Sequence, residues 1–248
     1  MELEQFWAEH PKAAIAFSGG VDSAYLLYSA VKSGARVKAY YAKTFFQPQF
    51  ELDDARKLAA QLGAELEILT LDILNIPHVA ENPQNRCYYC KQALFAAITQ
   101  KAKADGFPLL LDGTNASDVA TDRPGMKALE ELAVRSPLRE CGLTKAEIRR
   151  RSREAGLFTA QKPAYACLAT RIPTGEEITS QKLRRTEKAE NFLRELGLGD
   201  FRVRSRGEAA LIQVTQEDLP TVLDNREKIV SRLKEDYQSV MLDMEVRP

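Results

Sequence analysis

Short apolar runs alternate along the chain, up to about residue 162, with segments whose apolar residues recur at helical spacing. The runs predicted to be buried strands lie at 12–17, 36–42, 65–70, 109–112 and 133–138. The segments predicted to be helices lie at 2–9, 22–31, 50–62 and 87–105, with another from Thr144. Strands that alternate with helices are typical of a parallel sheet covered on both faces. We therefore expect a doubly wound α/β fold.

The pattern changes after Lys162-Pro163. The elements predicted there are a helix at 180–196, strands at 201–206 and 209–214, a helix at 216–236 and a strand at 238–245. This order is typical of a small α+β domain. We expect two domains, 1–172 and 173–248.

Composition indicates an ordinary globular protein. Of 248 residues, 44% are hydrophobic and 28% are charged, and no apolar run approaches the ~18 residues of a membrane span. The first residues are acidic and lack the basic start of a signal peptide, so we expect a cytoplasmic protein. Lys plus Arg and Asp plus Glu number 35 each, so no overall field attracts nucleic acid. We expect neither a nucleic-acid nor a membrane partner.

A glycine turn between the first predicted strand and its helix carries the first candidate chemistry. It reads Ser18-Gly19-Gly20-Val21-Asp22-Ser23. Glycines let the backbone approach a ligand, and the free amides at a helix start face anions. The turn matches neither the Walker pattern nor the dinucleotide-binding pattern. It predicts a phosphate cradle of another kind.

Cysteines carry the second candidate chemistry. The chain has four cysteines and two histidines, which favours metal or nucleophilic use over disulfides. Cys87 and Cys90 share one face at a predicted helix start, where the helix dipole lowers the pKa of a thiol. With a third, distant cysteine they could form a three-thiolate iron–sulfur site, while structural or redox use of the pair stays open. Cys167 has Arg171 four residues on, a neighbour that favours the nucleophilic thiolate.

The glycine turn resembles the pyrophosphate loop (PP-loop) of the ATP pyrophosphatases. Several further segments are similar to LarE-type ATP-dependent sulfur transferases of that superfamily. They are Arg-Cys-Tyr-Tyr-Cys-Lys at 86–91, Asp-Gly-Thr-Asn at 112–115, Asp-Arg-Pro-Gly at 122–125, Ser-Pro-Leu-Arg-Glu at 136–140, Gly-Leu-Thr-Lys at 142–145, Lys-Pro-Ala at 162–164, Cys-Leu-Ala-Thr-Arg-Ile-Pro at 167–173 and Arg-Val-Arg at 202–204.

The resemblance implies an activity. Such enzymes adenylate a carboxylate of a pyridinium dicarboxylate mononucleotide with ATP and Mg²⁺, and then convert it to a thiocarboxylate. The product is a precursor of the nickel-pincer cofactor of lactate racemase. The resemblance also suggests a homo-oligomer, with ATP bound by 1–172 and the substrate by 173–248.

It assigns residues as well. Ser18, Gly19, Gly20, Val21, Asp22 and Ser23 would bind the ATP phosphates, and Asp112 would be a further cofactor-binding residue. Asp22 would hold Mg²⁺, with Asp112 and Asp118 as alternatives by position. Cys167, assisted by Arg171, would deliver sulfur, while Arg202 and Arg204 would bind the substrate phosphate or form a solvated strand face. Two sulfur sources divide the family: the loop cysteine itself, or a [4Fe-4S] cluster. Because Cys87 and Cys90 accompany Cys167, we expect the cluster form, with these three cysteines as its ligands.

Three other functions are alternatives to a LarE-type sulfur transferase. A tRNA thiolase of the same superfamily would need a phosphate-tracking surface, which the neutral charge balance does not favour. A non-catalytic nucleotide-binding protein with a structural metal would bind ATP without releasing pyrophosphate. An amide-forming synthetase would need a glutaminase-type Cys/His pair, which the sequence lacks.

Overall fold

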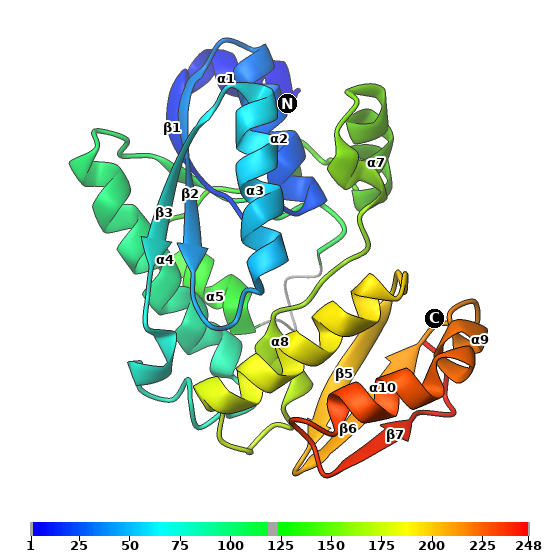
Figure 1. Ribbon diagram of the computed structural model, residues 1–248. Coiled ribbons are helices and arrows are strands. Elements are labelled where there is room, and N and C mark those ends of the chain that lie inside the picture. Colours follow the sequence, from blue (N-terminus) through cyan, green and yellow to red (C-terminus); the bar gives the residue numbers. More distant parts are fainter. Residues whose placement is uncertain (1, 119–123, 248) are drawn as a thin grey trace. The chain divides into compact units, whose positions relative to one another are not determined.

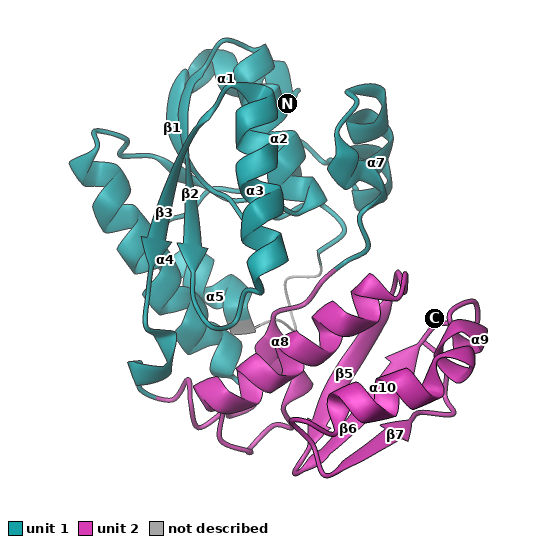
Figure 2. Ribbon diagram, viewed as in Figure 1, with its two compact units in different colours: residues 1–77, 85–164 teal, residues 78–84, 165–248 magenta. Residues whose placement is uncertain are grey.

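The structure is a computed structural model that describes residues 2–118 and 124–247. Two compact units divide the chain (Figure 2). Unit 1 comprises Met1–Pro77 and Asn85–Ala164, and unit 2 comprises His78–Gln84 and Tyr165–Pro248. The break after Ala164 precedes the expected boundary at 172/173. The division of ATP and substrate binding between two domains stays a prediction.

Unit 1 is built on a parallel sheet. Its strands are β1 (Lys12–Ala16), β2 (Arg36–Lys43), β3 (Glu65–Thr70) and β4 (Leu110–Leu111), in the order β3-β2-β1-β4. All three pairings are parallel, as predicted. The arrows of β2 and β3 point the same way in Figure 1. The order places β1 inside the sheet, so the loop that follows β1 leaves from its middle.

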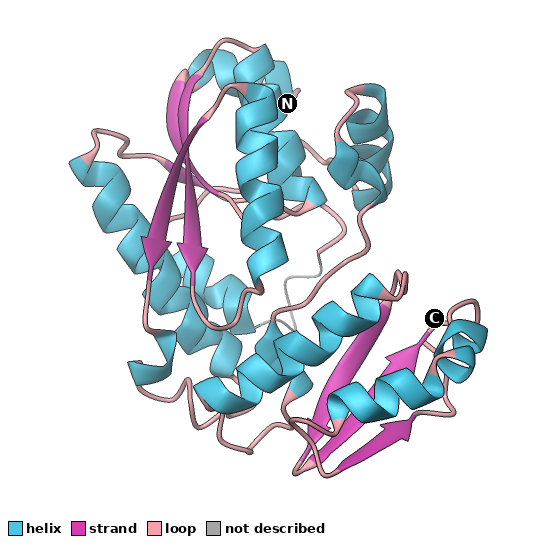
Figure 3. Cartoon of the chain, viewed as in Figure 1, coloured by secondary structure: helices cyan, strands magenta, loops and turns pink. Residues whose placement is uncertain are grey.

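Helices cover both faces of this sheet (Figure 3). The helices of unit 1 are α1 (Leu3–Glu9), α2 (Val21–Lys32), α3 (Gln49–Leu62), α4 (Arg86–Ala104), α5 (Pro124–Glu131), α6 (Pro137–Glu140) and α7 (Lys145–Glu154), with short 3-10 turns η1 (Ile73–Asn75) and η2 (Phe158–Gln161). Ala13 and Ile15 pack with α2 and α3, whereas Ala14, between them on β1, packs with α4. This alternation follows from the two-residue period of a strand. The doubly wound α/β architecture is confirmed.

The strand predicted at 133–138 is wrong. Only Arg135 forms a bridge, with Leu111, and the chain turns at once into α6. Proline lacks an amide proton for a sheet ladder and is well suited to the first turn of a helix. The apolar run therefore does not continue as a strand, because Pro137 begins α6.

Unit 2 has a three-stranded sheet in the order β5-β6-β7, made of β5 (Phe201–Arg206), β6 (Ala209–Val214) and β7 (Ser239–Leu242). Its helices are α8 (Ser180–Glu195), α9 (Leu219–Asp224) and α10 (Arg226–Leu233), preceded by the 3-10 turn η3 (Leu168–Arg171). The small α+β fold is confirmed. The single helix predicted at 216–236 is instead α9 and α10, which meet at Asn225.

Segment 78–84 precedes the α4 cysteines in the chain but folds with unit 2. The buried Asn82 donates from Nδ2 to the carbonyls of Ile172, Pro173 and Glu176, at 3.4, 2.7 and 3.2 Å. The amide of Gly175 donates to the carbonyl of Asn82, at 2.8 Å. These bonds fix the turn that follows the Cys167 loop.

Among the described residues, no helix is long and apolar enough to cross a bilayer.

Candidate active site

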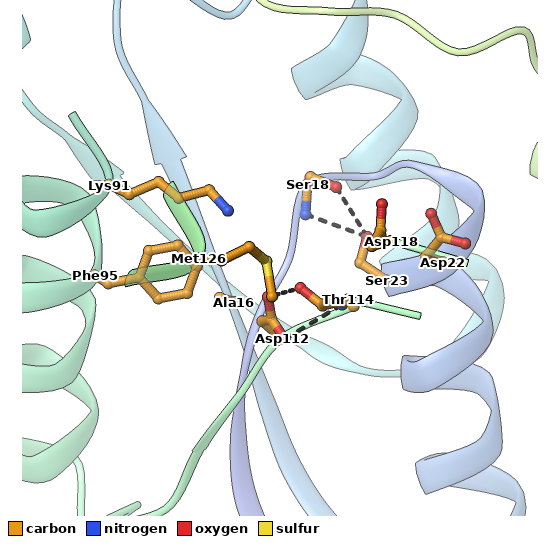
Figure 4. A pocket seen from close by; sticks show the side chains of 11 residues that line it. Ala16, Ser18, Asp22, Ser23, Lys91, Phe95, Asp112, Thr114, Asp118 and Met126 are labelled. Atoms are coloured by element: carbon orange, nitrogen blue, oxygen red, sulfur yellow. Dashed lines mark hydrogen bonds between the residues drawn. The ribbon is translucent and has the colours of Figure 1, made fainter. Parts of the chain in front are cut away.

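A cavity of about 340 Å³ opens in unit 1 where β1 and β4 end and α2 begins (Figure 4). It is lined by Ala16, Ser18, Asp22, Ser23, Lys91, Phe95, Asp112, Gly113, Thr114, Asp118 and Met126. Open α/β sheets bind ligands at the carboxyl ends of their strands, and this volume lies within the range of small-molecule sites. Four residues of the predicted phosphate cradle and its surroundings, Ser18, Asp22, Ser23 and Asp112, thus line one cavity.

The glycine turn is stabilised by the hydroxyl groups of its two serines. The Oγ atoms of Ser18 and Ser23 lie 3.1 Å apart, and the amides of Ser18 and Gly20 donate to Ser23 Oγ and Ser18 Oγ, each at 3.3 Å. Gly19 has a φ of +74°, a conformation that favours glycine. Gly20 is the N-cap of α2 and has no side chain to cap its first amides. Those amides are the donors that a phosphate would take.

Asp112 shapes the cavity wall. Its Oδ1 accepts from Ser136 Oγ at 2.6 Å and from the Thr114 amide at 3.2 Å, and its Oδ2 accepts from Thr114 Oγ1 at 2.5 Å. Both oxygens of this buried carboxylate are therefore engaged. Its expected contact with ATP stays a prediction.

Asp22 has an oxygen to offer a cation. Its Oδ2 accepts from Lys145 Nζ at 2.5 Å, while its Oδ1 is buried and has no hydrogen-bond partner among the described residues. Asp118 also lines the cavity, and its Oδ2 accepts from the Asn115 amide at 3.1 Å. Mg²⁺ prefers carboxylate oxygens, usually one or two of them together with substrate phosphates. Asp22 fits that requirement best.

Lys91 is a lining residue that the sequence reasoning did not single out. It extends from α4 into the cavity, and its ammonium group points toward the Ser18 turn (Figure 4). A Cβ on Gly125 would lie 2.7 Å from Lys91 Cδ, so this glycine leaves room for the extended lysine. Gly125 belongs to the motif predicted at 122–125, of which 122 and 123 lie outside the described residues.

Cys87 lies in the first turn of α4, near the predicted helix start, and Cys90 follows that turn; Cys87 is exposed and Cys90 is half-buried. Arg86 Nη2 lies 3.8 Å from Cys87 Sγ, within reach of a hydrogen bond. Cys141 packs against the unit 1 core, and burial raises the pKa of its thiol. Nowhere in the described part of the chain do three or more His, Cys, Asp or Glu side chains form a group able to hold a metal ion.

Cys167 lies in unit 2, directly before η3. Its thiol is half-buried, and its carbonyl accepts from the amide and the hydroxyl of Thr170, at 3.0 and 2.8 Å. Arg171, only 2% exposed, donates from Nη1 to the carbonyl of Ala166 at 3.1 Å and to Thr170 Oγ1 at 2.7 Å. Arg171 therefore shapes the loop that carries the thiol.

The two strand arginines meet this loop. Arg204 Nη1 donates to the carbonyl of Thr170 at 2.8 Å, and the Arg202 guanidinium lies 5.3 Å from the centre of the Tyr165 ring. Burial, followed by the charges of Arg171 and Arg247, lowers the pKa values of both Arg202 and Arg204. Cations that repel one another in a partly buried place favour an anion. Unit 2 thus brings together Cys167, Arg171, Arg202 and Arg204.

Glu190 on α8 ties this group together, and the sequence reasoning missed it. Its side chain is 1% exposed. It accepts from Arg171 Nε at 2.7 Å, from Tyr165 Oη at 2.5 Å and from the amide of Val203 at 3.0 Å. Nothing in the sequence pattern distinguishes this glutamate from the other charged residues of its helix.

Known proteins resemble either the first part of the chain or most of it. The family model "Queuosine biosynthesis protein QueC" matches residues 12–82. A protein of Synechocystis described as uncharacterized is 39% identical over 223 residues, which are 88% of this chain and 81% of that protein. The pyridinium-3,5-bisthiocarboxylic acid mononucleotide synthase of Lactiplantibacillus plantarum is 31% identical over 236 residues, which are 94% of this chain and 86% of the synthase.

The chain belongs to the LarE-type family. The predicted resemblance is confirmed, and this LarE-type protein is an ATP-dependent sulfurtransferase of the PP-loop superfamily. A tRNA-specific 2-thiouridylase MnmA of a Thermotoga species is a more distant relative, 28% identical over 75% of this chain and 60% of its own length.

Proposed function

We propose that this LarE-type protein adenylates a carboxylate of a pyridinium dicarboxylate mononucleotide and converts it to a thiocarboxylate, for the nickel-pincer cofactor of lactate racemase. The observation that carries the proposal is the hydrogen bond from Arg204 to the Thr170 carbonyl, because it joins a strand that carries two arginines to the loop that carries the Cys167 thiol. The name of the Lactiplantibacillus plantarum synthase supports the choice of substrate.

Adenylation would take place in the cavity of unit 1. The Ser18 turn and the α2 amides bind the β- and γ-phosphates, and Lys91 balances the charge that develops as pyrophosphate leaves. A substrate carboxylate oxygen attacks the α-phosphorus, and the bond from that phosphorus to the bridging oxygen of the β-phosphate breaks. Magnesium, held by Asp22, would neutralise phosphate charge when bound.

Unit 2 would hold the substrate phosphate and deliver sulfur. Arg202 and Arg204 donate paired, charge-assisted hydrogen bonds to the phosphate. The Cys167 thiolate then attacks the adenylated carbonyl, AMP leaves, and a thioester forms. In the sacrificial route a base removes the Cα proton of Cys167 and the Cβ–S bond breaks. The substrate leaves as a thiocarboxylate, and the protein keeps dehydroalanine.

The cluster route is the alternative sulfur source. Cys87 and Cys90 fit two of the thiolate ligands that an iron–sulfur cluster needs, and the third expected ligand, Cys167, belongs to unit 2. A cluster would supply an added sulfide and spare Cys167.

The test incubates the protein with ATP, Mg²⁺ and the pyridinium dicarboxylate mononucleotide, followed by mass spectrometry of the small molecules and of the protein. We expect AMP, pyrophosphate and a product in which sulfur replaces a carboxyl oxygen. Loss of the elements of H₂S at Cys167 would establish the sacrificial route. Iron in anaerobically purified protein, lost in Cys87→Ser, would establish the cluster route. Pyrophosphate release without any sulfur-containing product would contradict the proposed function.

A further inference from the structure

Lys145 stands out in unit 1 because its ammonium is bound to a residue of the phosphate cradle. Its Nζ lies 2.5 Å from Asp22 Oδ2, and the two side chains are 36% and 23% exposed. Asp22 is in the first turn of α2, and Lys145 is the first residue of α7. The ion pair thus joins the helix that begins at the predicted phosphate site to a second helix that also begins there.

The backbone of Lys145 is fixed, whereas its side chain has room to move. The Lys145 amide donates to Ser117 Oγ at 3.0 Å, and the Ala116 amide donates to the carbonyl of Leu143 at 2.9 Å. Thr144 caps α7 by accepting from the amide of Glu147. The lysine itself has a flexible four-carbon stem and is partly exposed. Its ammonium can therefore change partner while α7 stays in place.

Charge explains why the lysine rests on Asp22. The free amides at the start of α2 attract phosphate, but a carboxylate in the same turn repels it. The positive charge of Lys145 offsets the negative charge of that carboxylate. A divalent cation bound to Asp22 would take over this task and would compete with the ammonium for Oδ2, while the buried Oδ1 is already without a partner.

We infer that Lys145 is a phosphate-binding residue, held on Asp22 until the magnesium nucleotide arrives and then transferred to the phosphate oxygens. This inference rests on the proposed use of ATP. It gives Lys145 two opposite effects: it hinders binding of the metal alone, and it helps binding of phosphate. A purely structural ion pair would not act in opposite directions on the two ligands.

The test measures both ligands separately on the full chain with Lys145→Met. We expect Mn²⁺ alone, followed by electron paramagnetic resonance, to bind about threefold more tightly, because a competing ion pair of modest strength is gone. We expect pyrophosphate, measured by calorimetry in the presence of Mg²⁺, to bind about tenfold more weakly, because a charge-assisted bond is lost.

Matched variants complete the design. Lys101 is 37% exposed and also forms a 2.5 Å ion pair, but its partner Asp105 does not line this cavity as Asp22 does, so Lys101→Met should change neither affinity. Asp22→Asn combined with Lys145→Met should abolish the gain in Mn²⁺ affinity. If Lys145→Met shifts both ligands the same way, or neither, the inference is wrong. If the unaltered protein binds no pyrophosphate, the proposed function itself fails.

Discussion

At the scale of single residues, the buried charges of unit 2 matter most. Glu190 and Arg171 are both almost completely buried and face each other, and Tyr165 and Val203 also donate to the glutamate. Removing one member of a buried ion pair leaves the other without compensation, which costs far more than replacing both with apolar residues. The pair therefore also positions the Cys167 loop, through Arg171. Its effect on stability and its effect on the loop can be measured separately.

We expect Glu190→Gln to lower the free energy of unfolding by about 3 kcal/mol, since the Arg171 charge stays buried without its partner. The double variant Arg171→Met/Glu190→Leu should recover at least half of this loss in urea denaturation. Both variants should still release pyrophosphate from ATP, because the cavity of unit 1 keeps all its residues, but should yield less sulfur-containing product. A double variant that is no more stable than Glu190→Gln would contradict this account.

At the scale of elements, the cavity depends on how closely the segment after β4 approaches α2. Gly113 has no side chain, and a Cβ there would lie 2.8 Å from the Ser23 nitrogen and 3.1 Å from the Ser23 Cα. These atoms belong to the start of α2 and cannot rotate away as a long side chain would. The glycine thus sets the distance between the wall that Asp112 shapes and the phosphate cradle.

Gly113→Ala should push these two segments apart and cost about 1–3 kcal/mol of stability, the usual cost of overpacking. We expect the KM for ATP to rise more than kcat falls, because the cradle is displaced while its residues stay. Gly199→Ala is the control, since a Cβ at Gly199 would meet nothing within 4 Å. Unchanged ATP kinetics in Gly113→Ala would show that this approach does not position the cradle.

Elements with strong local signals could be predicted from the sequence. β3 has the predicted bounds 65–70, α3 ends at Leu62 with Gly63 as its C-cap at a φ of +62°, and Thr144 caps α7 as expected. The prediction failed at 133–138, where Pro137 turned an apolar run into a helix start. The glycine turn was predictable because its residues are adjacent. Lys91, Lys145 and Glu190 were not, because only tertiary packing brings them to their partners.

At the scale of the whole molecule, the anion sites proposed for the two units differ in kind. Unit 1 offers backbone amides, hydroxyl groups and lysines around a cavity, which suit a triphosphate and its metal. Unit 2 offers the guanidinium groups of Arg202 and Arg204, whose pKa values are lowered by burial and by the charges of Arg171 and Arg247, and which would suit a compact phosphate dianion. The residues that support each proposed site belong to one unit. Binding of the two ligands should therefore respond to different substitutions.

Arg204→Met should weaken binding of a pyridinium mononucleotide about tenfold, because its charge-assisted bonds to phosphate are lost, and should leave the affinity for ATP unchanged. Asp22→Asn should have the reverse effect when Mg²⁺ is present, since it removes the carboxylate that would hold the metal. Calorimetry with each ligand alone measures both changes. Arg226→Met removes an exposed arginine of α10, 73% exposed, and serves as the control for a lost positive charge in unit 2. If Arg204→Met weakened ATP and the mononucleotide equally, the two anion sites would not be divided between the units, and the assignment of the substrate phosphate to β5 would fall.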